Sequence, residues 1–325
     1  MAQLKTTFAG LTLNNPIIIS SSGLTNSLAK IQKLEEAGAG AVVLKSVFEE
    51  QINMQAGSMQ GDGSPEADDY LGAYVRSHAL NEHITLIEDV KKHCKIPVIA
   101  SINCYSDSEW TDFARLMEEA GADALELNIL SLQTSKDYTP GSFEQRHIDI
   151  LRHIKKVVRI PVIMKLGSNL TNPVALVNQL YANGAAAVVL FNRFYQPDIQ
   201  IDNLTFTTAN VMSSPSELSD RIRWTAIASA EVPQLDYAVS GGVHNGKGVI
   251  KSLLSGAAAV EVCSVIYQHG NQMIEEMKKE LTEWMDDKGY DSIAKFKGKM
   301  NASAAGDINP FERTQFMKYY SNHEE

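Results

Sequence analysis

The sequence predicts an α/β fold, a closed (β/α)8 barrel of the TIM type. Eight short apolar runs bounded by glycine or proline recur along the chain, and amphipathic helical patterns lie between them. Apolar strands that alternate with helices indicate a parallel sheet buried on both faces. An open dinucleotide-binding sheet is the rival fold, but no G-x-G-x-x-G motif opens a helix in this chain. We therefore expect residues 1–325 to form one barrel domain with long βα-loop insertions.

Each predicted strand is a short apolar run with a clear start. Four of the runs closely follow a Gly-Ala pair, three begin with proline, and the seventh closely follows Pro233. Every run gives way to small or polar residues. The expected strands are residues 16–20, 41–45, 97–101, 124–128, 161–165, 187–192, 237–242 and 259–264.

The predicted helices have periodic apolar positions and are followed by a glycine in most cases. In L-A-K-I-Q-K-L-E-E-A the apolar residues are spaced i, i+3 and i+6, and Gly38 then favours a helix stop. Ser106 or Asp107 is the expected N-cap of the second helix. Two long connections, residues 47–75 and 193–236, are expected to roof the active end of the barrel. The expected helices are residues 28–37, 107–120, 176–182, 216–228 and 248–254.

The composition is that of a soluble globular protein, with 44% apolar and 21% charged residues. A formal net charge of −10 and a pI of about 5.3 argue against nucleic acid or an anionic membrane as a partner. Three scattered cysteines without C-x-x-C spacing indicate a reduced protein with no disulfide and no metal site. The sequence shows neither an apolar signal region nor a membrane-spanning apolar run, so we expect a cytoplasmic protein.

Polar and small residues stand where the predicted strands end, and barrel enzymes place their active sites at that end. Serine or asparagine at a strand end commonly forms a turn with its own backbone, so each one alone is a weak signal. Lys45 and Lys165 are stronger candidates, because a buried lysine must be paired or must reach a cleft. Two lysines at one mouth favour an anionic or electron-rich ligand. The strand ends carry Ser20, Ser21, Ser22, Gly23, Lys45, Ser46, Ser101, Asn103, Asn128, Ser131, Lys165, Asn192, Ser240, Gly241, Gly242, Cys263 and Ser264.

The last two strand ends match a phosphate site that is common in barrels. Ser-Gly-Gly-Val follows the seventh strand and Cys-Ser follows the eighth. Gly241 and Gly242 allow close approach of the backbone, and N–H groups of both loops together with a helix N-terminus would hold a phosphate dianion. Cys104 and Cys263 are expected to line the core rather than act as nucleophiles.

One set of motifs runs along nearly the whole chain: L-T-L-N-N-P-I-I-I-S-S-S-G, V-V-L-K-S, V-I-M-K-L, A-V-S-G-G-V, L-L-S-G-A-A-A-V-E-V-C-S and K-G-Y-D-S-I-A-K-F-K-G-K. They resemble the motifs of the dihydroorotate dehydrogenase family, whose members are FMN-containing (β/α)8 barrels. The final motif and Ser-Gly-Gly are the most specific of them. The resemblance implies FMN as cofactor, oxidation of dihydroorotate to orotate or of a related dihydropyrimidine, and a homodimer.

The resemblance also implies roles for single residues. The stretch A-L-E-L-N-I-L-S falls on the family's catalytic loop, with Asn128 touching flavin and substrate and Ser131 as general base. Lys165 would stabilise reduced flavin near its N1–O2 edge, and Lys45 would hold the flavin edge or the substrate. The implied catalytic residues are Ser131, Lys45 and Lys165. The implied cofactor-binding residues are Ser21, Ser22, Gly23, Lys45, Ser46, Asn103, Asn128, Lys165, Gly241, Gly242, Cys263 and Ser264. The implied substrate-binding residues are Asn128, Gln133, Asn192 and Arg193.

The chain departs from the family pattern mainly on the substrate side. The catalytic loop has L-Q where the family has Pro-Asn, and Arg193 stands where Ser or Thr is usual. The family's N-x-x-G-x-x-N segment appears as Y-V-R-S-H-A-L-N, where Arg76 and His78 offer replacement donors. On the flavin side, Cys263 replaces a glycine. We therefore expect orotate to bind weakly and another planar anionic heterocycle to bind well. An alternative is that Arg193 only pairs with an acidic loop residue.

Other functions are compatible with the same residues. A paralogue could act on another small carbonyl compound, and a phosphate-binding lyase or isomerase could use Lys165 or Lys45 as a Schiff base. A flavin-binding protein without catalysis is a third alternative. The electron acceptor is open between a quinone, which a serine base suggests, fumarate, and NAD through a separate iron–sulfur subunit.

Overall fold

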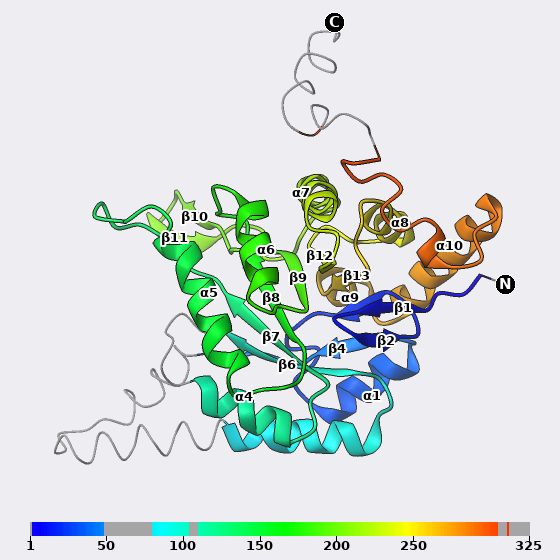
Figure 1. The fold of residues 1–325 in the computed structure, drawn as a ribbon, viewed down its shortest axis with the longest axis horizontal. Helices are drawn as coiled ribbons and strands as arrows, with labels where there is room; N and C mark the ends of the chain where they lie inside the picture. The colour runs from blue at the N-terminus through cyan, green and yellow to red at the C-terminus, as the bar shows by residue number, and fades with distance from the viewer. Residues whose placement is uncertain (1, 49–79, 104–109, 305–310, 312–325) are drawn as a thin grey trace, which may run out of the picture.

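The computed structural model describes residues 2–48, 80–103, 110–304 and 311, and eight parallel strands form a closed barrel within it (Figure 1). The strands pair in the order β4-β3-β13-β12-β9-β8-β7-β6, and the pairing of β4 with β6 closes the ring. The predicted fold is therefore confirmed. The barrel strands are β3 (Ile17–Ile19), β4 (Ala41–Val43), β6 (Val98–Asn103), β7 (Ala124–Ile129), β8 (Val162–Gly167), β9 (Ala187–Asn192), β12 (Asp236–Ser240) and β13 (Ala259–Val262), and the short β5 (Val47–Phe48) also pairs with β6.

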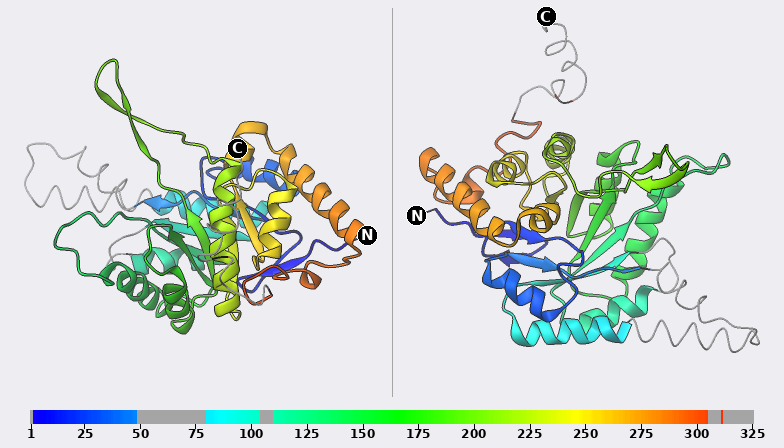
Figure 2. Two further views of the ribbon diagram at one scale, coloured as in Figure 1. Left: turned by 90° about the horizontal axis from the view of Figure 1, so that it is seen from above. Right: turned by 180° about the vertical axis from the view of Figure 1, so that it is seen from behind.

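Helices alternate with the strands and surround the barrel (Figures 1 and 2). Asparagine side chains cap two of them: Asn172 accepts a hydrogen bond from the Ala175 N–H, and Asn245 accepts one from Gly248. The five expected helices are present, although the expected start of the second one, residue 107, lies outside the described residues. The sequence patterns do not predict α5, α9, α10 or the helix at residues 80–93. The helices are α1 (Leu28–Glu36), α4 (Trp110–Glu119), α5 (Ser142–Lys155), α6 (Pro173–Ala182), α7 (Leu218–Glu231), α8 (Gly246–Leu254), α9 (Ser264–His269) and α10 (Gln272–Lys288), and residues 80–93 are also helical.

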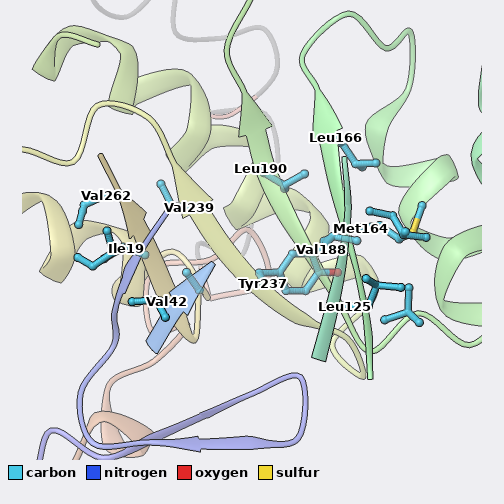
Figure 3. Close-up of a cluster of buried hydrophobic side chains, with 14 of the residues drawn as sticks. Ile19, Val42, Leu125, Met164, Leu166, Val188, Leu190, Tyr237, Val239 and Val262 are labelled. Atoms are coloured by element: carbon cyan, nitrogen blue, oxygen red, sulfur yellow. The ribbon is translucent and has the colours of Figure 1, made fainter. Parts of the chain in front are cut away.

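Apolar side chains form two layers, one on each side of the barrel wall. Outward-facing residues such as Leu125 and Val188 belong to the cluster that also contains the buried faces of the helices (Figure 3). Inward-facing residues such as Ile163 form a second cluster inside the barrel. A hairpin of β1 (Thr6–Phe8) and β2 (Leu11–Leu13) adds its buried side chains to this inner cluster. Since apolar groups fill that end of the barrel, inward-facing polar groups gather towards the other end.

The connection of residues 193–236 contains more structure than the loop and helix expected from the sequence. It begins with an antiparallel hairpin of β10 (Pro197–Gln200) and β11 (Thr205–Thr208), which projects from the barrel as an arm (Figures 1 and 2). The expected helix then follows as α7. Most of the other expected roof, residues 49–75, lies outside the described residues, as do Arg76, His78, Cys104 and both N-cap candidates at 106 and 107.

Within the part of the chain that the structure describes, no helix is both long and apolar enough to cross a membrane.

Candidate active site

The predicted site residues lie at the carboxyl ends of neighbouring strands, at the mouth of the barrel. Strand register places Asn103 opposite Asn128, and Asn128 opposite Lys165. Asn192 is the last residue of β9, and Ser240 is the last residue of β12. The fold therefore brings together side chains that are separated by more than a hundred positions in the chain. Their functional roles stay predictions.

Three serines form a continuous chain of hydroxyl groups at one side of the mouth. Ser46 Oγ lies 2.9 Å from Ser21 Oγ and 2.8 Å from Ser101 Oγ, and the Ser46 N–H donates to Ser21 Oγ at 2.9 Å. Ser21 and Ser46 follow β3 and β4, and Ser101 lies within β6; these three strands are neighbours in the barrel. Each hydroxyl both donates and accepts, so the chain can reorient its protons to suit a ligand edge.

Asn128 and Asn192 are joined side chain to side chain. The Asn192 amide nitrogen donates to Asn128 Oδ1 at 2.7 Å, and Asn192 Oδ1 accepts from the Arg193 N–H at 2.7 Å. Because Asn128 uses its carbonyl oxygen in this contact, its amide N–H groups are the donors it can offer to a ligand. The pair thus presents a donor set suited to carbonyl or carboxylate oxygens.

Ser131 lies just beyond β7 and is held from two sides. The Gln133 amide donates to Ser131 Oγ at 3.3 Å, and the Asn169 amide donates to the Ser131 carbonyl at 2.9 Å. Leu132, which lies between Ser131 and Gln133 in the chain, is exposed. The structure therefore assigns Gln133 a contact that the sequence does not predict: it orients the proposed base.

Arg193 forms hydrogen bonds within the long connection of residues 193–236. Its Nε donates to Glu217 at 3.1 Å, and its two terminal nitrogens donate to the carbonyls of Val211 and Asn210 at 2.7 and 2.6 Å. This arrangement matches the alternative in which Arg193 pairs with an acidic loop residue. A substrate role for Arg193 would require these contacts to be exchanged.

The two loops of the expected phosphate site lie beside each other, after the paired strands β12 and β13. Gly241 and Gly242 have φ values of 92° and 80°, which strongly favour glycine. The neighbouring loop begins α9 at Ser264, whose Oγ accepts a hydrogen bond from the Ser213 N–H at 2.9 Å. Ser213 Oγ in turn lies 3.0 Å from His244 Nε2. Ser213 and His244 are polar groups near this site that the sequence does not predict.

Gly242 also has a packing reason to be glycine. A Cβ atom there would lie 2.9 Å from the Leu218 Cα and would also clash with the Leu218 nitrogen, so the start of α7 leaves no room for one. At Gly23, a Cβ atom would lie 2.7 Å from the Tyr267 hydroxyl. A bulky residue at Gly242 would therefore displace α7 and would not test phosphate binding alone.

The thiol of Cys263 fits the expectation of a lining residue. Burial raises its pKa above the ordinary value of 9.0, although a hydrogen bond with Ser22 and the charge of Lys165 oppose the rise. A thiol that stays protonated at neutral pH is a poor nucleophile. Cys263 therefore lines the mouth next to Ser22.

The two lysines of the mouth differ in environment. Lys45 is exposed, whereas Lys165 is 4% exposed and lies among charged side chains. The Lys165 ammonium lies 2.5 Å from Glu261 Oε2 and 3.6 Å from Glu126 Oε1, and it donates to Ser20 Oγ at 2.9 Å. Burial alone would lower the pKa of Lys165, but the two carboxyl groups outweigh it and raise the pKa above the ordinary value of 10.5.

Glu126 and Glu261 are site residues that the sequence analysis missed. The available signal was an acidic residue in the middle of an apolar strand, in A-L-E-L-N and in A-V-E-V-C-S. A charged residue at such a position is rarely tolerated without a partner. Two acidic and one basic residue on inward-facing strand positions indicate one shared cluster.

Comparison with known proteins identifies the family. The model of the family described as dihydroorotate dehydrogenase matches residues 3–285. The chain belongs to the dihydroorotate dehydrogenase family.

Named relatives span most of the chain. It is 30% identical over 309 residues to the dihydroorotate dehydrogenase B (NAD(+)) catalytic subunit of Thermoplasma volcanium, which covers 92% of this chain and 98% of the relative. It is 25% identical over 317 residues to the NAD-dependent dihydropyrimidine dehydrogenase subunit PreA of Escherichia coli, which covers 92% of this chain and 77% of that subunit. The dihydroorotate dehydrogenase family consists of oxidoreductases acting on CH–CH groups, which agrees with the class expected from the sequence.

Proposed function

We propose that this dihydroorotate dehydrogenase family member is an FMN-dependent dehydrogenase that oxidises dihydroorotate or a related dihydropyrimidine. The observation that carries the proposal is the meeting of two features at one mouth. The paired loops at Gly241 and Ser264 have the backbone conformation and helix start of a phosphate site. The polar strand ends around Asn128 and Lys165 stand at the same end of the barrel.

The residues present fit FMN in the chemistry of their donors. The Gly241–Gly242 loop and the start of α9 would hold the phosphate, with the hydroxyl of Ser264 as a further donor. The serine chain through Ser46 and the exposed Lys45 would line the flavin ring edge. FMN, when bound, supplies the acceptor for a hydride from the substrate.

The loop after β7 supplies the proton chemistry. Oxidation of a C–C bond next to a carbonyl requires removal of an acidic C–H proton, and Ser131 would accept it. The amide of Gln133 donates to Ser131 Oγ, so it favours negative charge on that oxygen over the neutral hydroxyl. Asn169 fixes the backbone of the same residue. Because a serine alkoxide is too basic to persist, Ser131 would start as a neutral hydroxyl and would pass its own proton to a further acceptor along the loop as it takes the substrate proton.

The surroundings of Lys165 speak against a Schiff-base lyase. A lysine nucleophile needs an uncharged amine, which proteins obtain by lowering its pKa. Here the carboxyl groups of Glu126 and Glu261 raise the pKa of Lys165 and keep the ammonium charged. Lys165 is therefore better suited to electrostatic stabilisation than to covalent catalysis.

Anaerobic mixing with dihydroorotate tests the proposed function. Protein reconstituted with FMN is expected to become yellow, and dihydroorotate or another dihydropyrimidine is expected to bleach its flavin absorbance. Protein that takes up no FMN would overturn the proposal. Flavin that no dihydropyrimidine reduces would favour a paralogue with another substrate.

Orotate is expected to bind weakly. Gln133 and Arg193 already donate to Ser131 and Glu217, so a ligand carboxylate would have to compete for their N–H groups. Each ligand group left without its partner should cost about 1–3 kcal/mol of binding free energy. A titration followed by flavin absorbance measures the affinity. Micromolar or tighter binding of orotate would contradict this expectation.

We also propose that the protein is a cytoplasmic homodimer, with the β10–β11 arm in the interface. The arm and its tip expose large apolar side chains, with 60% of Ile199, 79% of Ile201, 85% of Leu204 and 85% of Phe206 accessible. Exposed apolar patches of this kind commonly mark interaction sites. Sedimentation that gives the mass of one chain at micromolar concentration would refute the dimer.

A further inference from the structure

Glu126, Glu261 and Lys165 meet inside the barrel, directly above its apolar filling. β7 and β13 are four strands apart in either direction around the ring, so Glu126 and Glu261 extend towards each other from opposite walls. Strand register places Glu126 opposite Ile163 and Glu261 opposite Ile18, and both isoleucines belong to the inner apolar cluster. The cluster therefore stands between the apolar layer and the mouth.

Three of the four carboxyl oxygens in this cluster lack a hydrogen-bond donor among the described residues. Lys165 Nζ contacts Glu261 Oε2 and donates to Ser20 Oγ, and Ser20 Oγ in turn lies 3.0 Å from Glu261 Oε2. Among the described residues, no hydrogen-bond donor reaches Glu261 Oε1 or either carboxyl oxygen of Glu126, although all three atoms are buried. The ammonium is 3.6 Å from Glu126 Oε1, which is longer than a hydrogen bond.

Two ionised carboxylates would leave this interior with a surplus negative charge. Glu126 is fully buried and Glu261 is 2% exposed, and one lysine can neutralise only one of them. An unpaired charge in such surroundings takes up a proton rather than stay ionised. A proton between the two carboxyl groups would remove the surplus charge and would also give an orphaned oxygen a hydrogen bond.

We propose that Glu126 is a neutral carboxylic acid in the folded protein and donates its proton to Glu261, so that the pair carries one negative charge that holds the Lys165 ammonium in place. Glu126 and Glu261 are then positioning residues for Lys165. The inference concerns the protonation of the barrel interior and does not depend on which substrate the enzyme uses.

The direction of the pKa shifts agrees with this assignment. Burial raises the pKa of Glu126 well above its ordinary value of 4.5, and the neighbouring Glu261 raises it further, against the opposing charge of Lys165. Burial also raises the pKa of Glu261, but the charge of Lys165 and the hydrogen bonds from Lys165 and Ser20 outweigh it and bring the pKa below its ordinary value.

Among the described residues, the charged and titratable groups around Glu126 come from few elements. β8 contributes Lys165 and β13 contributes Glu261, and the thiol of Cys263 directly follows β13. Ser20, which follows β3, and Ser101 of β6 are neutral at all pH values of interest. Cys263 is protonated at neutral pH because its pKa is raised by burial. Glu126 is thus the one group of the cluster expected to hold an extra proton near pH 7.

Infrared spectroscopy of the unliganded protein tests the proposal. At neutral pH the wild type is expected to show the carbonyl stretch of a protonated carboxylic acid, which shifts when the glutamates carry ¹³C. The band should vanish in Glu126→Gln and also in Glu261→Gln, because either change leaves one carboxyl group to pair with Lys165 as a carboxylate. The control Glu276→Gln, an exposed position on α10, should retain the band.

The pH dependence of unfolding supplies a second readout. The folded state holds a proton that the unfolded state releases, so the wild type should lose stability relative to Glu126→Gln as pH rises above about 4.5. The ratio of the two unfolding equilibrium constants should change about tenfold per pH unit until Glu126 itself ionises.

A wild-type infrared spectrum without a glutamic acid band overturns the proposal. An infrared band that survives in Glu126→Gln also overturns the proposal, because the proton would then lie on Glu261.

Discussion

Replacing Lys165 by methionine is expected to lower the free energy of unfolding by about 3–5 kcal/mol, the usual cost of removing one partner from a buried ion pair. The methionine fits the volume of the stem, so the loss is electrostatic. The Lys165 side chain is 5% exposed, so little solvent screens the carboxylate of Glu261 once its 2.5 Å contact has gone. Urea denaturation of the wild type and the variant at pH 7 measures the difference.

Lowering the pH should partly restore the stability of the Lys165→Met variant. Without the ammonium, the pKa of Glu261 rises above its unfolded value, so its contribution to stability is present at low pH and is lost as pH rises. The loss of stability should therefore be smaller at pH 5 than at pH 8. Adding Glu261→Gln removes the unpaired charge and should recover most of the loss.

An exposed lysine provides the matched control for this experiment. Lys279→Met on α10 changes a side chain that is 74% exposed and should stay within about 0.5 kcal/mol of the wild type. If Lys165→Met is as stable as Lys279→Met at pH 8, then Lys165 does not neutralise a buried carboxylate.

The barrel could be predicted from the sequence because its signals are local. Each strand is a short apolar run close to a Gly-Ala pair or a proline, and most of the expected helices are followed by a nearby glycine such as Gly38. The β10–β11 hairpin could not be predicted in this way. Every residue of its two strands is exposed, so the strands carry no alternation of buried and exposed residues for a pattern to detect.

The site was predictable in its position but not in its pairings. Strand-end polarity located Asn128, Lys165 and the glycine loops, because a barrel places all such ends at one mouth. The two carboxylates near Lys165 come from β7, which pairs with β8, and from β13, which lies across the ring from β7. Sequence spacing does not reveal which strands face each other. Arg193 shows the same limit, because Glu217 becomes its partner only when the start of α7 folds over the mouth.

Ser131→Ala is expected to slow reduction of bound flavin by substrate about 10²–10⁴-fold, the usual value of a general base. The change removes only the hydroxyl that accepts from Gln133, and the backbone contact with Asn169 can persist. FMN affinity should therefore be unchanged, since the expected phosphate loops follow β12 and β13, which lie across the ring from β7. Anaerobic stopped-flow mixing of the reconstituted protein with its substrate measures the reduction rate.

Three further variants separate catalysis by Ser131 from a structural role of its loop. Ser135→Ala alters an exposed serine of the same loop, whose Oγ accepts from the Asp137 N–H, and the variant should reduce flavin at the wild-type rate. Gln133→Ala removes the donor to Ser131 Oγ and should give an intermediate rate, because the oxygen loses the group that favours its negative charge. Ser131→Cys retains an acidic group at the same position and should recover part of the rate lost in Ser131→Ala, with a pH profile displaced towards lower pH because a thiol ionises more readily than a hydroxyl. If Ser131→Ala and Ser135→Ala reduce flavin equally fast, the proton acceptor lies elsewhere in the mouth.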